Sequence, residues 1–219
     1  MRRLTPQGST MNANNIVNEE PSTKNWTSEI IGWLKRVPIT FWVFLVNLLM
    51  YCYTAILSQN FYFIDIWVQE FFGVSGESFA AGRFFVFITA MFVHQDLLHL
   101  GLNLFSLAVI GFVFETRGGR TNFLIIYFLA GLTTNALSLI LFPQWTFVGS
   151  SAAIFGIAGA TIMRLLQSVI FGALFILALF AMAPPMSFLS HGIGAIVGVV
   201  SDYFLRKRTN KNNQKTRNR

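Results

Sequence analysis

The chain has 219 residues, of which 54% are hydrophobic and only 11% are charged, and its net charge is +7. Soluble globular domains carry about 25% charged residues, so this composition excludes that class and indicates an integral membrane protein. The single cysteine, Cys52, excludes an intrachain disulfide and a cysteine-based metal cluster.

The first 38 residues are polar compared with the rest of the chain. No apolar stretch follows Arg2 and Arg3, as it would in a cleavable signal peptide. Trp26, Ile30 and Leu34 share one face of a helix, which is typical of a segment that lies in the membrane interface. The sequence therefore predicts a flexible cytoplasmic tail over 1–38 with a short interfacial stretch.

Apolar segments long enough to cross a bilayer, which needs about 20 residues per helix, follow this tail. The predicted spans are 39–57, 95–114, 122–142, 149–165, 168–183 and 187–205. They predict an all-α membrane domain of six transmembrane helices over 39–205, followed by a basic cytoplasmic tail over 206–219. Six spans place both ends of the chain on one side of the membrane.

The basic residues predict which side that is. If both termini are cytoplasmic, all of the 16 Lys and Arg residues except Arg83 lie on the cytoplasmic side. The positive charge then anchors the topology and contacts anionic lipid of the bilayer, and nucleic acid is not an expected partner. Because no organelle presequence is evident, we expect a multi-pass protein of a bacterial plasma membrane.

Polar residues gather at the start of the second, fourth and sixth spans. These spans would all enter the bilayer from the outer face, so their first turns lie at one depth. Polar side chains are costly inside a bilayer and usually face a bundle interior or a water-filled cavity, so this clustering predicts a functional site. The set includes all three histidines and consists of His94, His99, Asn103, Ser150, Ser151 and His191.

The fourth span is short. From Gly149 to Arg164 it covers roughly 24 Å, at about 1.5 Å per residue, which is less than the thickness of the hydrocarbon layer. Its first turn would therefore lie below the outer surface. Ser150 and Ser151 would then stand at a helix N-terminus, where unpaired backbone N–H groups and the helix dipole favour negative charge.

These residue types predict acyl transfer. A serine becomes a strong nucleophile when a positioned base takes its proton, and His191 is the candidate base. His99, Asn103 and a backbone N–H are candidate donors to the oxyanion. No acidic residue is expected at this depth, so we predict a serine–histidine dyad rather than a triad, with the imidazole of His191 packed on Phe155, one turn after Ser151.

Other interpretations stay open. Ser151 lies among small residues that let helices approach closely, so it is also compatible with simple helix packing. His94 is expected to be a structural polar residue bonded inside the bundle. A transporter or channel would use the same histidines and Asn103 as part of a polar path, but the inner halves of these helices are almost wholly apolar.

The motifs also resemble those of one family. The chain contains Gly149, Ser150, Ser151 and Ala152 with a later Gly156, the spacing His-x4-His-x3-Asn at His94, His99 and Asn103, and His191 followed by Gly194. In this order they resemble the motifs of the rhomboid intramembrane serine proteases, over about residues 39–205. Glu115 and Arg117 resemble the Glu-x-Arg motif of the same family, for which a structural ion pair or a cap is expected. The aromatic loop 58–93 resembles a loop that lies half in the bilayer.

The resemblance implies a rhomboid-like bundle with specified site residues. It implies that Ser151 is the nucleophile and His191 the base, that His99 and Asn103 line the oxyanion hole, and that Phe155, Gly149 and Gly194 support them. No metal or cofactor is expected. The implied reaction is cleavage of single-span membrane proteins near the outer membrane face, and the oligomeric state is left open.

Two features depart from the family pattern. Ala152 stands where a glycine usually follows the nucleophile, and the loop lacks the usual adjacent Trp and Arg. Because a fold alone does not prove activity, the main alternative to a protease is a non-catalytic relative that binds or escorts membrane proteins through the same fold, and the presence of Ser151 and His191 argues against it.

Overall fold

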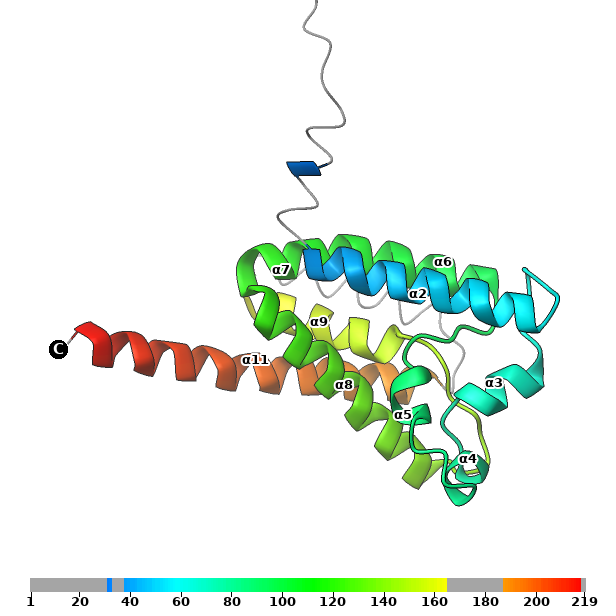
Figure 1. Ribbon diagram of the computed structural model, residues 1–219. Helices are drawn as coiled ribbons and strands as arrows, with labels where there is room; N and C mark the ends of the chain where they lie inside the picture. Colours follow the sequence, from blue (N-terminus) through cyan, green and yellow to red (C-terminus); the bar gives the residue numbers. More distant parts are fainter. Residues whose placement is uncertain (1–30, 33–37, 165–186, 218–219) are drawn as a thin grey trace, which may run out of the picture.

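The computed structural model describes residues 31–32, 38–164 and 187–217, and the regular structure in these ranges is helical. The fifth predicted span, 168–183, and the interfacial stretch at Trp26 to Leu34 lie wholly or largely outside the described residues. With the labels of Figure 1, the elements are α2 (Pro38–Leu57), α3 (Ile66–Phe72), α4 (Gly76–Ala80), α5 (Val86–Thr89), α6 (Leu97–Ser106), the π-helical turn η1 (Leu107–Gly111), α7 (Phe112–Gly118), α8 (Arg120–Leu141), α9 (Ser151–Arg164) and α11 (Ser187–Arg217).

Within the described ranges, four helical stretches are long and apolar enough to cross a membrane: Ile39–Leu57, Leu97–Gly118, Arg120–Leu141 and Phe188–Thr216. They correspond to the first, second, third and sixth predicted spans. The fourth predicted span forms a shorter apolar helix, α9. The described part of the chain is therefore an all-helical membrane bundle, and its second span begins at Leu97, two residues after the predicted start at 95.

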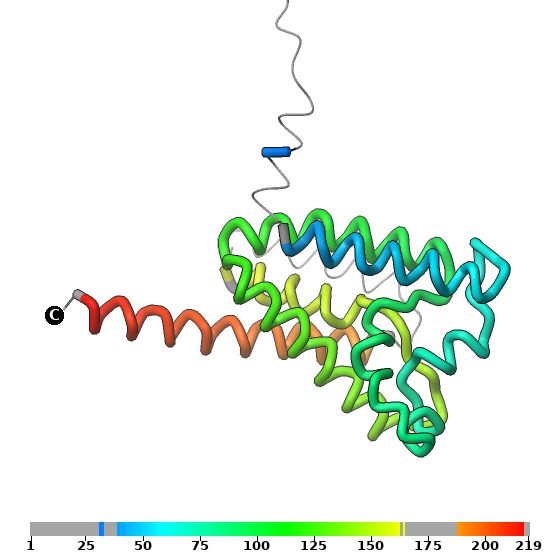
Figure 2. The backbone as a smooth tube through the Cα atoms, in the orientation of Figure 1, coloured from blue at the N-terminus to red at the C-terminus, as the bar shows by residue number. Residues whose placement is uncertain are grey.

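Helix α9 is the central element of the bundle. It packs against α7, α8 and α11, and the ribbon and the tube show it enclosed between α2 and α11 (Figures 1 and 2). Every residue from 152 to 161 is buried. A helix that is buried on all sides needs no polar face, which explains why this segment reads as continuously apolar.

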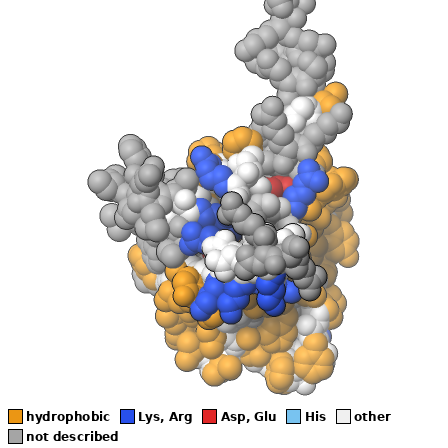
Figure 3. Space-filling view, turned by 90° about the vertical axis from the view of Figure 1, so that its left-hand side faces the viewer, with side chains coloured by type: hydrophobic (Ala, Val, Ile, Leu, Met, Phe, Trp, Pro, Cys, Tyr) orange, Lys and Arg blue, Asp and Glu red, His pale blue; other side chains and the backbone are white. Residues whose placement is uncertain are grey.

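The two ends of the bundle carry different residues. Arg117, Arg120, Arg164 and Arg206 lie where α7, α8, α9 and α11 meet. We call this the basic end, and Figure 3 shows Lys and Arg side chains gathered on this face. Helices α3, α4 and α5 lie at the opposite end, which we call the site end (Figure 1). Helix α11 extends beyond the bundle at the basic end as far as Arg217, so most of the predicted basic tail 206–219 is helical.

The π-helical turn η1 explains how the second span keeps one face buried along its length. His99 and Glu115 are sixteen positions apart, which in a uniform α-helix separates their side chains by about 160°. A π-helical turn inserts about one extra residue and reduces this angle to about 60°. Both side chains then face the bundle, one at the site end and the other at the basic end.

Glu115 is buried and caps the N-terminus of α2. Its carboxylate accepts hydrogen bonds from the N–H groups of Ile39 (3.1 Å) and Thr40 (2.8 Å) and from the Thr40 hydroxyl (2.8 Å). Nε of Arg120 lies 3.8 Å from the same carboxylate. The cap expected for Glu115 is therefore present, but its ion pair is with Arg120. Arg117 is two positions away on a helix, so its side chain points elsewhere and donates to the Val113 carbonyl.

Replacing Glu115 by glutamine should lower the free energy of unfolding by about 3 kcal/mol, because an amide presents a donor to a pocket lined by donors. Equilibrium unfolding in mixed detergent micelles measures the change. The control is Glu70→Gln on α3, where the carboxylate is exposed, and its effect should stay within about 0.5 kcal/mol. Equal stability of the two variants would contradict the capping role of Glu115.

Candidate active site

The chain reaches α9 through a short extended stretch that is held at two points. Phe147 and Val74 exchange backbone hydrogen bonds of 2.9 and 3.0 Å in an isolated antiparallel bridge. The N–H of Gly149 donates to the carbonyl of Ala90 at 2.8 Å. Val74 and Ala90 are both buried parts of the connection between the first two spans. This connection therefore fixes the point at which α9 begins, at Ser151.

Gly149 brings the α9 N-terminus against His99. Its φ of +119° lies in the region that favours glycine. A Cβ atom at this position would lie 2.9 Å from Cε1 and 3.0 Å from Nε2 of His99, and 3.9 Å from Oγ of Ser151. The His99 imidazole and the Ser151 hydroxyl therefore flank the same glycine.

Ser150 and Ser151 have different surroundings. Ser150 is only 1% exposed, and its Oγ lies 3.2 Å from Nε2 of His94. Ser151 is partly exposed. Of the two serines, only Ser151 is therefore accessible, whereas Ser150 is part of the buried packing next to it.

The His94 ring has a defined protonation state. His94 precedes the second span, and its burial, together with the smaller effect of the neighbouring His99, lowers its pKa to about 3, so the ring is neutral. Nδ1 lies 3.2 Å from the Phe92 carbonyl, which only accepts hydrogen bonds. Nδ1 must therefore carry the proton, and Nε2 accepts a hydrogen bond from the Ser150 hydroxyl. This is the structural role expected for His94.

The first two turns of α6 hold His99 and Asn103. Oδ1 of Asp96 accepts a hydrogen bond from the His99 N–H at 2.7 Å and so caps the helix. Nδ2 of Asn103 donates to the His99 carbonyl at 2.8 Å. An amide nitrogen carries two hydrogens, so one Asn103 donor is used inside its own helix and one remains. In the described part of the chain, Nδ1 of His99 is buried without a hydrogen-bond partner.

Removal of the Asp96 cap should destabilise the α6 N-terminus. Asp96→Ala is expected to lower the free energy of unfolding by about 1 kcal/mol, because the His99 N–H loses its acceptor. Asp96→Asn is the matched control, since its side-chain oxygen also caps helices. Equilibrium unfolding in mixed micelles compares the two. A loss for Asp96→Asn as large as that for Asp96→Ala would show that the cap is not the cause.

Helices α9 and α11 bring His191 to the same end of the bundle. The rings of His191 and Phe155 are stacked, with centroids 4.2 Å apart and planes 17° apart. Phe155 is one turn after Ser151 on α9. Three residues after His191, Gly194 packs against the carbonyl of Ala152, where a Cβ atom would overlap it. The structure thus gathers the predicted site residues of α6, α9 and α11 at the site end.

Three carboxylates lie on or beside the spans that carry the predicted site residues, and each of them has another role. Asp96 caps α6, Glu115 caps α2, and Asp202 contacts Arg164 and Arg206 at the basic end. These three carboxylates, in the part of the chain that the structure describes, are therefore engaged in caps and ion pairs. Backbone N–H groups in the first turn of α9 are available to stabilise negative charge near Ser151.

Sequence reasoning missed several contacts that build the site. It did not predict the bridge between Val74 and Phe147, because this bridge is formed by backbone groups and neither side chain indicates it. It assigned His94 a structural role but did not pair it with Ser150. The adjacency of the two serines was the only signal that one of them is a buried partner.

Comparisons with known proteins show to which sequences this chain is similar. The family model described as Rhomboid domain matches residues 81–208. Rhomboid-like protease 3 of Toxoplasma gondii is 28% identical over 156 residues, which cover 69% of this chain and 58% of that protein. Rhomboid-like protein 11, chloroplastic, of Arabidopsis thaliana is 27% identical over 202 residues, covering 79% and 67%. Inactive RHOMBOID-like protein 8 of the same plant is 31% identical over 81 residues, covering 37% and 23%.

These relatives therefore include one named as a protease and one named as inactive, and the chain spans only part of their length. The matched Rhomboid domain model covers more than half of the chain and includes the predicted site residues of α6, α9 and α11. The chain belongs to the rhomboid family.

Proposed function

We propose that this protein is an intramembrane serine endopeptidase in which Ser151 and His191 form a catalytic dyad. The observation that carries the proposal is the position of Ser151. It is the partly exposed first residue of a buried helix, its hydroxyl and the His99 ring both lie beside Gly149, and the ring of His191 stacks on Phe155 one turn further along the same helix.

Each step has a residue to perform it. Oγ of Ser151 attacks the carbonyl carbon of the scissile peptide bond while His191 takes the hydroxyl proton. The oxyanion that forms accepts hydrogen bonds from the Ser151 N–H, from His99 and from the remaining Asn103 donor. Collapse of the intermediate breaks the C–N bond, and the proton on His191 passes to the leaving amine. A water molecule, deprotonated by His191, then hydrolyses the acyl-enzyme and releases the carboxylic acid product.

The proposed substrates are single-span membrane proteins cut close to the site end. Helices α3 and α5 and their connections expose Trp67, Phe71 and Phe85, and such aromatic side chains suit the membrane interface. A site at this depth is within reach of water, which the second step consumes. Substrate helices that unwind easily would expose a peptide bond at lower cost, so we expect a small side chain before the cut and helix-breaking residues nearby.

The proposed topology places the site end outside and both termini in the cytoplasm. The arginines of the basic end support it, because cytoplasmic segments carry the excess of Lys and Arg. We propose a bacterial plasma membrane as the location, although one similar protein is named as chloroplastic.

The experiment is cleavage of a fluorescent single-span substrate by the protein reconstituted in liposomes. The wild type should cleave and Ser151→Ala should not. Cleavage by both would exclude Ser151 as the nucleophile. Substrate binding without cleavage by the wild type would instead favour a non-catalytic binding or escort protein, an alternative that the relative named as inactive keeps open.

A further inference from the structure

The interface between α9 and α11 is made of small residues. Gly198 packs against the carbonyl of Gly156, Gly159 against that of Ala195, and Gly194 against that of Ala152, each so closely that a Cβ atom would overlap the facing backbone. Interfaces of this kind allow close approach of two helices. These contacts set the distance between the two helices. A polar contact with a defined direction adds a further constraint on how far one helix is shifted along the other.

Both dyad residues depend on that shift. Ser151 and His191 stand near the site end of α9 and α11, and the two helices run in the same direction toward the basic end. Arg164 follows Ser151 by thirteen positions and Asp202 follows His191 by eleven, which is about 20 Å and about 16 Å of helix. A regular helix transmits an axial displacement along its length, so a displacement at the basic end would also separate Ser151 from His191.

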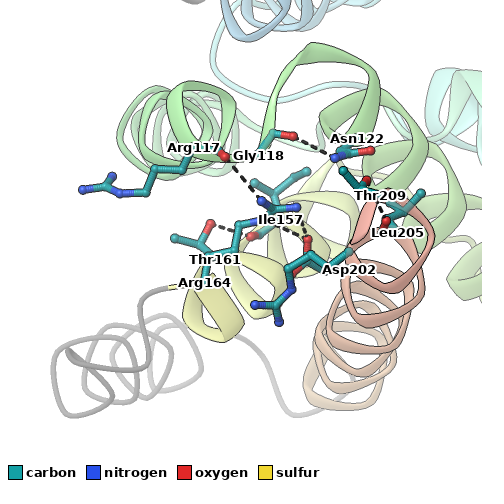
Figure 4. Close-up of polar contacts among 10 residues, drawn as sticks. Arg117, Gly118, Asn122, Ile157, Thr161, Arg164, Asp202, Leu205 and Thr209 are labelled. Carbon is teal, nitrogen blue, oxygen red and sulfur yellow. Dashed lines mark hydrogen bonds and ion pairs between the residues drawn. The ribbon is translucent and has the colours of Figure 1, made fainter. Parts of the chain in front are cut away.

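A directional polar contact joins the two helices at the basic end (Figure 4). Nε of Arg164 donates to Oδ1 of Asp202 at 2.8 Å, and Nη2 donates to the same oxygen. Nη1 donates to the carbonyl of Arg117 at 3.3 Å, and the guanidinium lies over the ring of Phe114, 5.0 Å from its centre. Arg164 thereby links α7, α9 and α11.

The Asp202 carboxylate is fully buried, and the Arg164 side chain is only 14% exposed. The second oxygen of Asp202 lies 3.0 Å from Nε of Arg206, which is 37% exposed and belongs to the same helix as Asp202. A buried carboxylate requires a cation at close range. A shift of α11 by one residue, about 1.5 Å, would break the contact with Arg164 but leave that with Arg206 unchanged.

We propose that Asp202 and Arg164 are positioning residues that fix the axial register of α9 and α11, and through it the placement of Ser151 relative to His191. The inference rests on the proposed dyad. Asp202 and Arg164 lie at the basic end and not at the site end. We therefore expect them to affect turnover and not substrate binding.

The first test compares turnover in Arg164→Gln, Asp202→Asn and the double variant. Each is assayed with the single-span substrate at a temperature well below its own unfolding midpoint. We expect kcat to fall at least tenfold in each variant while KM stays within twofold. The double variant removes both charges, so it leaves no unpaired buried ion and folds even if a single variant does not. Unchanged kcat in the double variant would overturn the proposal.

Arg206→Gln is the matched control. It removes the other cation beside the same carboxylate, but this contact lies within α11 and does not join two helices. Its kcat should stay within twofold of the wild type. A fall in Arg206→Gln equal to that in Arg164→Gln would show that the charge of the cluster matters and the register does not.

A second readout does not depend on activity. In a Cys52→Ala background, spin labels at the exposed positions Trp145, before α9, and Leu189, on α11, report the separation of the two helices at the site end. The distance distribution should shift or broaden in the double variant and remain unchanged in Arg206→Gln. A wild type that does not cleave would overturn the proposed function alone. Unchanged distances in the double variant would overturn the register role alone.

Discussion

Replacement of Ser151 by alanine, or of His191 by alanine, is expected to abolish covalent labelling by a fluorophosphonate probe. The probe reacts with a serine whose hydroxyl proton is taken by a neighbouring base, so either change should reduce the labelling rate by about 1,000-fold or more. Labelling in detergent, read by in-gel fluorescence, measures the rate without a known substrate.

Ser150→Ala is the control for this prediction, since it removes the adjacent hydroxyl. Ser150 is buried, and its hydroxyl donates to His94, so its loss should lower stability by about 1 to 2 kcal/mol but preserve labelling. Labelling of Ser151→Ala at the wild-type rate would overturn the assignment of the nucleophile.

Gly149→Ala is expected to reduce the rate of labelling by about 100-fold, the effect typical of losing one oxyanion donor. An added Cβ atom would lie 2.9 Å from Cε1 of His99, and the φ of +119° at this position is one that alanine rarely adopts. The His99 ring and the start of α9 would both have to move. Labelling kinetics together with an unfolding curve separate this effect from simple loss of the fold.

Gly101→Ala provides the comparison for Gly149→Ala. Gly101 lies inside α6, is exposed, and has no atom within 4 Å of an added Cβ. An alanine there should leave labelling unchanged and stabilise the helix by roughly 0.5 to 1 kcal/mol. If Gly149→Ala labels within twofold of Gly101→Ala, the close packing of His99 on Gly149 is not needed for activity.

Much of the fold follows from local features of the sequence. The described spans follow from the length of the apolar segments. The start of α6 follows from Asp96, because aspartate is favoured at the N-cap of a helix and disfavoured inside it. The gathering of His99, Ser151 and His191 at one end follows from the direction of alternate spans. None of these inferences needs a contact between distant residues.

The features that sequence reasoning missed all depend on such contacts or on helix geometry. Nothing in Leu107–Gly111 marks a π-helical turn, yet the turn decides which way Glu115 faces. The pairing of Arg164 with Asp202 requires the axial register of two helices. The bridge of Val74 with Phe147 depends on the path of a long loop.

The most direct test of the central claim is the position of the covalent adduct. The wild-type protein is treated with a fluorophosphonate, digested and mapped by tandem mass spectrometry to the individual serine. A proton-sharing pair of Ser151 and His191 predicts an adduct on Ser151 that disappears in His191→Ala. An adduct on Ser150, or one on Ser151 that persists at the same rate without His191, would contradict it.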